Sequence, residues 1–150
     1  TLIIHGRTMA EMSKVPAHWD LIGEAAKMAQ EAGTLAVGNG DVMSLSEGRE
    51  KAEKYGVDGI MIGRGIFHNP WFFNDKIDPK LVAPEERLRL LLEHSRLFDE
   101  LWQDKKSFDL MKKFFKVYVS EWEGAKELRA KLMETKGRKQ AEDVVKDYLK

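Results

Sequence analysis

The stretches VGNGDVMS (Val37–Ser44) and IMIGRGIFHNPW (Ile60–Trp71) decide the fold of this chain. Each stretch begins with a short apolar run and ends abruptly in glycines. Apolar runs without polar alternation are typical of parallel strands that are buried on both faces. Two such runs, separated by a segment long enough for a helix, predict a strand–helix–strand unit with a right-handed crossover.

The pattern of alternating strands and helices extends to the N-terminus. Gly33 and Gly56 are predicted to end helices in the left-handed conformation. Ser44 and Glu47 have the spacing of a capping box, which predicts a helix start. The predicted elements are strands at Thr1–Ile4, within Thr34–Asp41 and at Gly59–Ile62, and helices at Asp20–Ala32 and Ser44–Tyr55. Residues 1–80 are therefore predicted to be three parallel βα units.

Beyond residue 80, glycines are rare and apolar residues recur at helical spacing. Pro84 suits a first helical position, and Glu85 and Glu86 suit the positive end of the helix dipole. A second helix is predicted to bury Phe108, Met111, Phe115, Tyr118 and Trp122, and two more follow in GAKELRAKLMET and RKQAEDVVKDYL. Four amphipathic helices with short connections predict a small all-α bundle over residues 81–150.

The composition excludes several classes of protein. The formal net charge is zero, and hydrophobic and charged residues make up 43% and 33% of the chain, an ordinary balance for a globular protein. Cysteine is absent, which excludes disulfides, thiolate metal ligands and thiol nucleophiles within this chain, and no metal site is predicted. No apolar stretch is long enough to span a membrane and no signal peptide is evident, which predicts a cytoplasmic location. The chain opens on a strand pattern without Met, so we expect it to be a fragment of a longer protein.

The two glycine corners, Gly38–Asp41 and Gly63–Gly65, are predicted to follow neighbouring strands at one end of the sheet. Glycine lets a phosphate approach backbone N–H groups without a Cβ in the way. A pair of such loops is typical of the phosphate site after the last two strands of a (β/α)8 barrel, and Arg64 would add a cation. The alternative is that these glycines only permit tight βα turns. His5 is predicted to lie at the same end of the sheet.

Several motifs resemble those of tRNA-dihydrouridine synthases. IIHGRT, GNGD, and DGIMIGRG with NPW just after it resemble the last three barrel strands of that family, in the same order and spacing. SRLFDE, LMKKFFKVY and GAKELRAKLMET resemble its C-terminal helical domain. The resemblance implies an α/β fold that forms the last three βα units of a (β/α)8 TIM barrel, followed by an all-α bundle. It also implies an FMN enzyme that reduces uridine in tRNA to 5,6-dihydrouridine, with NADPH as reductant.

The resemblance also assigns residues to the cofactor. The residues implied to bind FMN are His5, Asn39, Gly40, Asp41, Gly63 and Arg64. The proton-donating Cys of the family, together with a Lys and a Gln that contact the flavin, lies on earlier strands, so no catalytic residue is assigned in this chain. We therefore expect the isolated chain to be inactive.

Contacts with tRNA are predicted in both parts of the chain. Lys112, Lys113 and Lys116 are predicted to share one side of a helix, opposite its apolar side, and Arg7 is assigned to the same role at the mouth of the barrel. Clustered cations of this kind are typical of nucleic-acid surfaces. The alternative for the lysines is an ordinary solvated helix face.

Two other functions stay open at this point. One is a different FMN or sugar-phosphate TIM-barrel oxidoreductase, such as a dihydroorotate dehydrogenase-like protein. The other is a non-catalytic RNA-binding fragment. In either case three parallel strands cannot close a barrel, so we expect the chain alone to associate with itself through open sheet edges.

Overall fold

The computed structural model describes the backbone of all 150 residues and every side chain except that of Asp104. The chain forms two compact units, Thr1–Asp75 and Lys76–Lys150, which we call the N-terminal unit and the helical unit. The boundary falls between residues 75 and 76, whereas the sequence analysis placed it at residue 80. No helix in the described part of the chain combines the length and the apolar character that crossing a membrane requires.

The N-terminal unit contains a parallel sheet of three strands, as the sequence predicted. The strands are β1 (Leu2–His5), β2 (Ala36–Asn39) and β3 (Gly59–Met61), and their order in the sheet follows their order in the chain. His5 pairs with Asn39 and Asn39 with Met61, so the three carboxyl ends lie side by side. This register brings the loops that follow the strands to one edge of the sheet.

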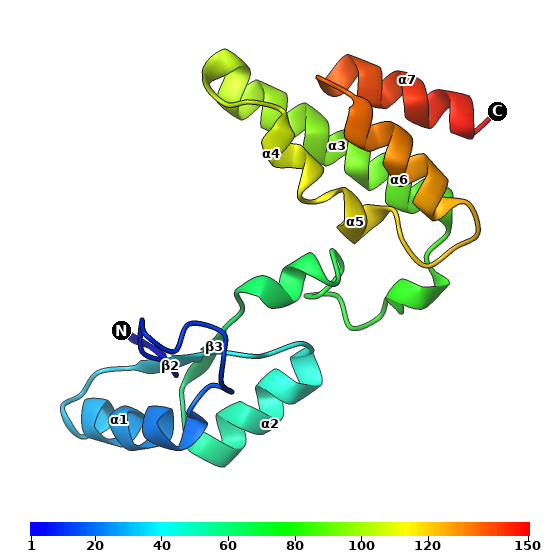
Figure 1. Cartoon of the computed structure of the whole chain (residues 1–150). Helices are drawn as coiled ribbons and strands as arrows, with labels where there is room; N and C mark the ends of the chain where they lie inside the picture. The colour runs from blue at the N-terminus through cyan, green and yellow to red at the C-terminus, as the bar shows by residue number, and fades with distance from the viewer. The chain divides into compact units, whose positions relative to one another are not determined.

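Two helices cover one face of this sheet (Figure 1): α1 (Trp19–Glu31) and α2 (Leu45–Tyr55). Their buried side chains form the core of the unit with Ile4, Ala36 and Ile60 of the strands. A Cβ at Gly38 would lie 2.6 Å from the indole ring of Trp19, so the helix packs directly on the strand backbone. The three parallel strands and the two helices between them are therefore confirmed. In this unit β3 is followed by the 3-10 turn Arg64–Phe67 and not by an α-helix, and the closed barrel stays a proposal.

Local signals set the ends of α2. The Oγ of Ser44 accepts a hydrogen bond from the N–H of Glu47 (3.1 Å), and the carboxylate of Glu47 accepts one from the N–H of Met43 (2.8 Å). Gly56 ends the helix with φ = 64°, a conformation that favours glycine. The predicted capping box and the predicted stop are both confirmed.

The opposite face of the sheet carries Ile3, Val37 and Met61, because side chains alternate along each strand. Ile3 and Met61 are 56% and 46% exposed, respectively. This face would be the interior of a barrel. In the described structure it stays largely open to solvent, while the face under α1 and α2 is buried.

The helical unit is built around α3 (Pro84–Trp102), against which α5 (Phe115–Tyr118) and α7 (Arg138–Tyr148) pack, with α6 (Ala125–Glu134) in contact with both α5 and α7. A short α4 (Asp109–Lys112) completes the bundle, and 3-10 turns lie at 79–81 and 103–105. The fully buried side chains of its core are Leu88, Leu91, Met111, Phe115, Val119, Leu132, Ala141 and Val145. An all-α second part was predicted, and the structure has one.

The second helix predicted in this unit is interrupted. The N–H groups of Phe114 and Val117 bond to carbonyls three residues earlier (2.9 Å each), and Val119 leaves the helical conformation. Aromatic and β-branched residues fill this segment and are weak helix formers. Trp122 consequently lies in the loop before α6 and not on a helix with Phe108.

Candidate functional site

A cavity of about 390 Å³ opens at the carboxyl edge of the sheet. This volume lies within the range of about 300–1,000 Å³ that is usual for small-molecule sites. The predicted site residues of the N-terminal unit all line it: His5, Arg7, Asn39, Gly40, Asp41, Gly63 and Arg64. The structure thus gathers residues from the loops after all three strands around one space.

The glycines of the two corners differ in what a side chain at each position would meet. Gly40 has φ = 138°, and a Cβ there would lie 2.6 Å from the Cβ of Ala17. A Cβ at Gly65 would lie 2.4 Å from the carbonyl oxygen of Val42, so that position is also closed by the protein. At Gly63, in contrast, the nearest protein atom to a Cβ would be the Nδ2 of Asn39 at 3.9 Å. Only Gly63 therefore leaves free space beside its backbone, on the side of the cavity.

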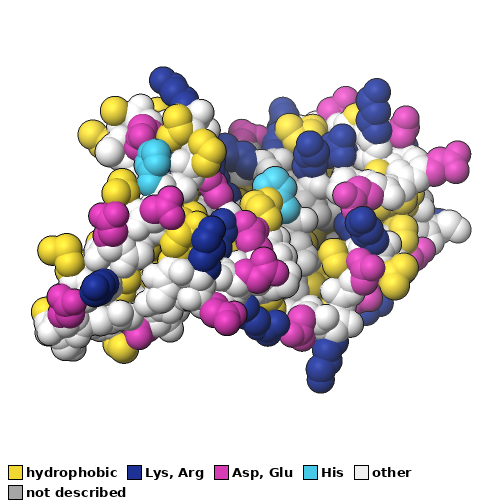
Figure 2. Space-filling view, turned by 90° about the horizontal axis from the view of Figure 1, so that it is seen from below, with side chains coloured by type: hydrophobic (Ala, Val, Ile, Leu, Met, Phe, Trp, Pro, Cys, Tyr) yellow, Lys and Arg dark blue, Asp and Glu magenta, His cyan; other side chains and the backbone are white. Residues whose placement is uncertain are grey.

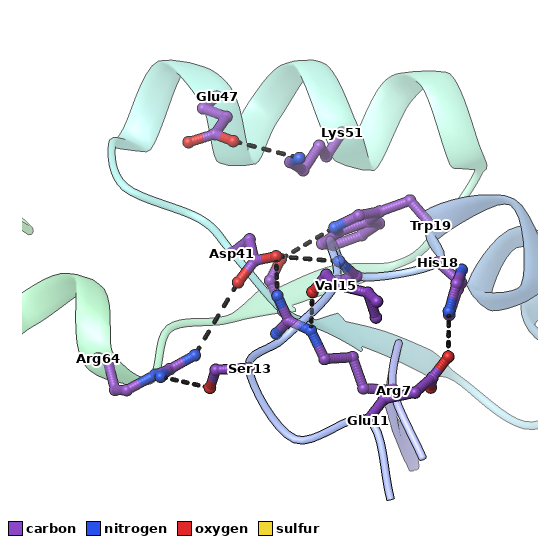
Figure 3. A network of polar contacts seen from close by, with 12 residues as sticks. Arg7, Glu11, Ser13, Val15, His18, Trp19, Asp41, Glu47, Lys51 and Arg64 are labelled. Carbon is purple, nitrogen blue, oxygen red and sulfur yellow. Dashed lines mark hydrogen bonds and ion pairs between the residues drawn. The ribbon is translucent and has the colours of Figure 1, made fainter.

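Asp41 is paired with Arg7 (Figure 3). A guanidinium N–H of Arg7 donates to Oδ2 of Asp41, and the N–H of Ala17 donates to the same oxygen at 2.9 Å. The Arg7 side chain is only 5% exposed. The hydrogen bond from Arg7, followed by that from Ala17 and the charge of Arg64, lowers the pKa of Asp41 below its ordinary value, so Asp41 is a carboxylate at neutral pH.

Arg64 reaches across the mouth of the cavity from the turn after β3. Its Nη1 donates to the Oγ of Ser13 at 2.7 Å, and its Nη2 lies 4.0 Å from Oδ1 of Asp41. Most of its side chain is exposed to solvent. Arg64 is therefore the cation that an incoming ligand meets, whereas Arg7 is buried behind it.

The loop between β1 and α1 is held by a second polar group. The carboxylate of Glu11 accepts hydrogen bonds from the N–H of Thr8 (2.8 Å) and lies 2.8 Å from Nε2 of His18. These interactions, that with Thr8 first, lower the pKa of Glu11 to about 2. Ser13 and Ala17, which contact Arg64 and Asp41, belong to this same loop.

His68 also lines the cavity, and the sequence analysis missed it. It follows the 3-10 turn Arg64–Phe67 that begins at the second glycine corner. Its position, five residues after Gly63, was the feature of the sequence that could have indicated a place near the cavity. The cavity wall thus contains two imidazoles, those of His5 and His68, and the guanidinium of Arg64. Among the described side chains that line it, the one carboxylate is that of Asp41, which is paired with Arg7. The cavity is therefore suited to an anionic group.

The predicted RNA contacts of the helical unit do not share one helix. Lys112 ends α4, with its Nζ 2.7 Å from Asp109 and its side chain 16% exposed. Lys113 lies between α4 and α5, and Lys116 lies on α5; both are exposed. On the face seen in Figure 2, positive and negative side chains are intermixed. The cluster is thus reduced to two freely exposed lysines with one ion-paired neighbour.

A parallel sheet flanked by helices, with a cationic cavity at the carboxyl edge of its strands, is typical of α/β proteins that bind phosphorylated ligands. The family described as "Dihydrouridine synthase (Dus)" matches residues 1–150. The chain therefore belongs to the dihydrouridine synthase family. This match supports the resemblance over the alternative of an unrelated flavin or sugar-phosphate barrel.

Individual relatives agree with the family. A "Probable tRNA-dihydrouridine synthase" from Staphylococcus aureus is 43% identical over 150 residues, which is 98% of this chain and 45% of the relative. A "Probable tRNA-dihydrouridine synthase 2" from Bacillus subtilis is 44% identical over 150 residues, covering 98% of this chain and 46% of the relative. The chain thus spans about half the length of the curated relatives it matches.

Proposed function

We propose that this chain contributes the FMN phosphate site and a tRNA-binding surface to a tRNA-dihydrouridine synthase. Its N-terminal unit would form the last three βα units of a (β/α)8 barrel, and its helical unit would bind tRNA. The whole protein would reduce uridine to 5,6-dihydrouridine, with NADPH as reductant, in the cytoplasm. The names of the relatives, which include tRNA and dihydrouridine synthase, support this proposal.

One observation carries the cofactor assignment: the free space beside Gly63 adjoins the exposed guanidinium of Arg64. A phosphate there would meet backbone N–H groups and a cation without displacing protein atoms. His5 and Asn39 end β1 and β2 on the cavity side and would contact the rest of FMN, and Gly40 would shape the loop beside them, where Ala17 packs against it. These residues fit the group.

The residues of this chain would bind and orient, and FMN, when bound, would supply the two-electron reduction of the uracil 5,6 double bond. His5 would donate a hydrogen bond to the flavin, and Arg64 would neutralise its phosphate. The proton for the uracil ring would come from the Cys that the family resemblance puts on an earlier strand. We therefore expect this chain alone to turn over no tRNA.

The phosphate site is tested by comparing FMN with riboflavin, which lacks the phosphate. We expect calorimetric titration of the 150-residue chain to show at least tenfold tighter binding of FMN, a difference of about 1.4 kcal/mol. Gly63→Val should abolish the difference by filling the free space. Arg64→Ala should cost about 1–3 kcal/mol of FMN binding, the loss of one charge-assisted contact. Equal affinities for both flavins in the unmodified chain would contradict the assignment.

The RNA surface is tested by the salt dependence of tRNA binding. Replacing Lys113 and Lys116 by Ala should lower the magnitude of the log–log slope by roughly 1.4–1.8, because each phosphate contact contributes about 0.7–0.9. Adding Lys112→Ala should lower the magnitude of the slope by less than either of the other two substitutions, since Lys112 is already paired with Asp109. Arg7→Gln should leave the slope unchanged, because Arg7 is buried and paired with Asp41.

An unchanged slope in the Lys113→Ala/Lys116→Ala variant would show that these lysines are an ordinary solvated surface. Binding of tRNA with no flavin binding would favour a non-catalytic RNA-binding chain.

A further inference from the structure

Arg7 and Asp41 were assigned by sequence to two different ligands, but each is the main partner of the other. Arg7 donates from its guanidinium to Asp41 and from Nε to the carbonyl of Val15 at 2.6 Å. Oδ2 of Asp41 receives a second donor, the N–H of Ala17. The pair thus joins the loop after β1 to the loop after β2 and is occupied by protein groups.

The backbone at Asp41 is unusual in the same place. Asp41 has φ = 48°, in the left-handed region that non-glycine residues rarely adopt. The carbonyl of the preceding Gly40 accepts a hydrogen bond from the buried indole Nε1 of Trp19 at 2.9 Å. Backbone in a sparsely populated conformation, held on both sides, is often found where a functional group must be fixed.

The group that this arrangement fixes is Arg64 (Figure 3). Oδ1 of Asp41, which the Arg7 and Ala17 donors leave to the cavity side, lies 4.0 Å from Nη2 of Arg64. Ser13, which accepts from Nη1 of Arg64, belongs to the loop that Arg7 holds. Both contacts of Arg64 are therefore made by residues that Arg7 contacts, Asp41 directly and Ser13 through the loop whose Val15 carbonyl Arg7 bonds.

A direct contact between Asp41 and a phosphate would bring two anions together. We propose instead that Asp41 is a positioning residue: paired with Arg7, it holds the guanidinium of Arg64 at the mouth of the cavity for an anionic ligand. The anion is the phosphate of the proposed function, on which this part of the inference rests. The contacts that hold Arg64 are present in the protein without a ligand, so this part of the inference does not require FMN.

The first experiment measures Arg64 without any ligand. In the 150-residue chain labelled with 15N-arginine, with the Arg64 signal assigned from Arg64→Lys, we expect an ordered Nε–H in the unmodified protein. Asp41→Asn should lower its order parameter markedly. Asp58→Asn is the matched control, because Asp58 also accepts a hydrogen bond from a backbone N–H, that of Ala36, at the opposite end of β2 from Asp41. An unchanged Arg64 signal in Asp41→Asn would overturn the proposal.

Arg7→Lys provides a second variant if Asp41→Asn does not fold. It keeps the positive charge beside Asp41 but removes the planar group that bonds both Asp41 and Val15. If Asp41 positions Arg64 through this pair, Arg7→Lys should also lower the Arg64 order parameter. A fully ordered Arg64 in a folded Arg7→Lys protein would count against the pair.

The second experiment is a double-mutant cycle on FMN binding. Asp41→Asn should weaken FMN by on the order of tenfold, the size of one disturbed charge-assisted contact, and leave riboflavin unchanged. In an Arg64→Gln background the same change should have no further effect. A loss of equal size in that background would mean that Asp41 does not act through Arg64. If the unmodified protein does not distinguish FMN from riboflavin, the proposed phosphate site fails, while the order parameter still decides whether Asp41 holds Arg64.

Discussion

The N-terminal unit and the helical unit are equal in length, but they bury apolar side chains to different extents. Among the described residues, thirteen form the buried core of the helical unit and seven that of the N-terminal unit. The N-terminal unit leaves one sheet face open and devotes its loops to the polar groups around the cavity. The helical unit therefore has the larger closed core, whereas the N-terminal unit keeps an open sheet face beside its cavity.

The open sheet face should produce the largest effect, a change of molecular mass. We expect the 150-residue chain to associate with a second copy at high micromolar concentration, because β1 and β3 are unpaired edges beside exposed apolar residues. Ile3→Lys should shift the mass measured by light scattering toward the monomer. Leu21→Lys on α1, where Leu21 is 59% exposed, is the matched control. A monomer at every concentration would show that the open face does not recruit a partner.

The core of the helical unit should give the next largest effect. Phe115 is fully buried, and Phe115→Ala should lower the free energy of unfolding by about 3–5 kcal/mol. Urea titration followed by circular dichroism measures this loss. Leu101→Ala removes an exposed side chain from α3 and should change stability by no more than about 0.5 kcal/mol. Similar losses in the two variants would contradict the closed core described for this unit.

Substitutions at two glycines beside the cavity should have different effects, one on the stability of the fold and the other on ligand binding. Gly65→Ala puts a Cβ against the carbonyl of Val42 and should lower the free energy of unfolding by about 1–3 kcal/mol. Gly63→Ala meets no protein atom closer than 3.9 Å and should change ligand binding more than stability. Urea titration of both variants makes the comparison. A larger loss of stability at Gly63 would show that its free space is not part of the site.

The smallest expected effect is a pH dependence confined to the helical unit. Burial lowers the pKa of His94 below its ordinary value of 6.5, and its Nδ1 lies 2.8 Å from the hydroxyl of Tyr118. The unfolded chain then binds a proton more readily than the folded unit. Stability should therefore be fully present above pH 6.5 and fall as the pH drops through the lower pKa of the folded unit.

Urea titrations between pH 7.5 and 5 test this dependence. His94→Gln should flatten it, and His68→Gln, outside the helical unit, should not. If the unmodified chain gains stability on acidification and His94→Gln removes that gain, the assigned direction is wrong.

Features that depend on neighbouring residues could be predicted from the sequence. The Ser44–Glu47 capping box and the stop at Gly56 are set within a few residues, and the strands follow from short apolar runs. The approach of the two glycine corners followed from the rule that parallel strands end at the same edge. These local and topological rules predicted the sheet, its two helices and the meeting of the two glycine corners at one edge.

The roles of Arg7 and Asp41 could not be predicted in the same way. They are 34 residues apart, and their pairing depends on how the loop after β1 folds back over the sheet. The break between α4 and α5 also escaped prediction, because apolar spacing continues through it while weak helix formers and core packing interrupt the backbone. His68 was missed because it lies in the turn beyond the second glycine corner, and neither a motif nor the family resemblance assigned a role to that position.

Trp19 has a practical consequence. Its indole is buried, donates to the carbonyl of Gly40, packs on Gly38, and lies 5.1 Å from the Nζ of Lys51. Gly40 lines the cavity, Gly38 lies in β2 and Lys51 lies in α2. The chain thus contains an intrinsic fluorophore whose emission depends on the position of the loop after β2. In a variant with Trp71, Trp102 and Trp122 replaced by Phe, the emission spectrum of Trp19 would report changes in the position of that loop.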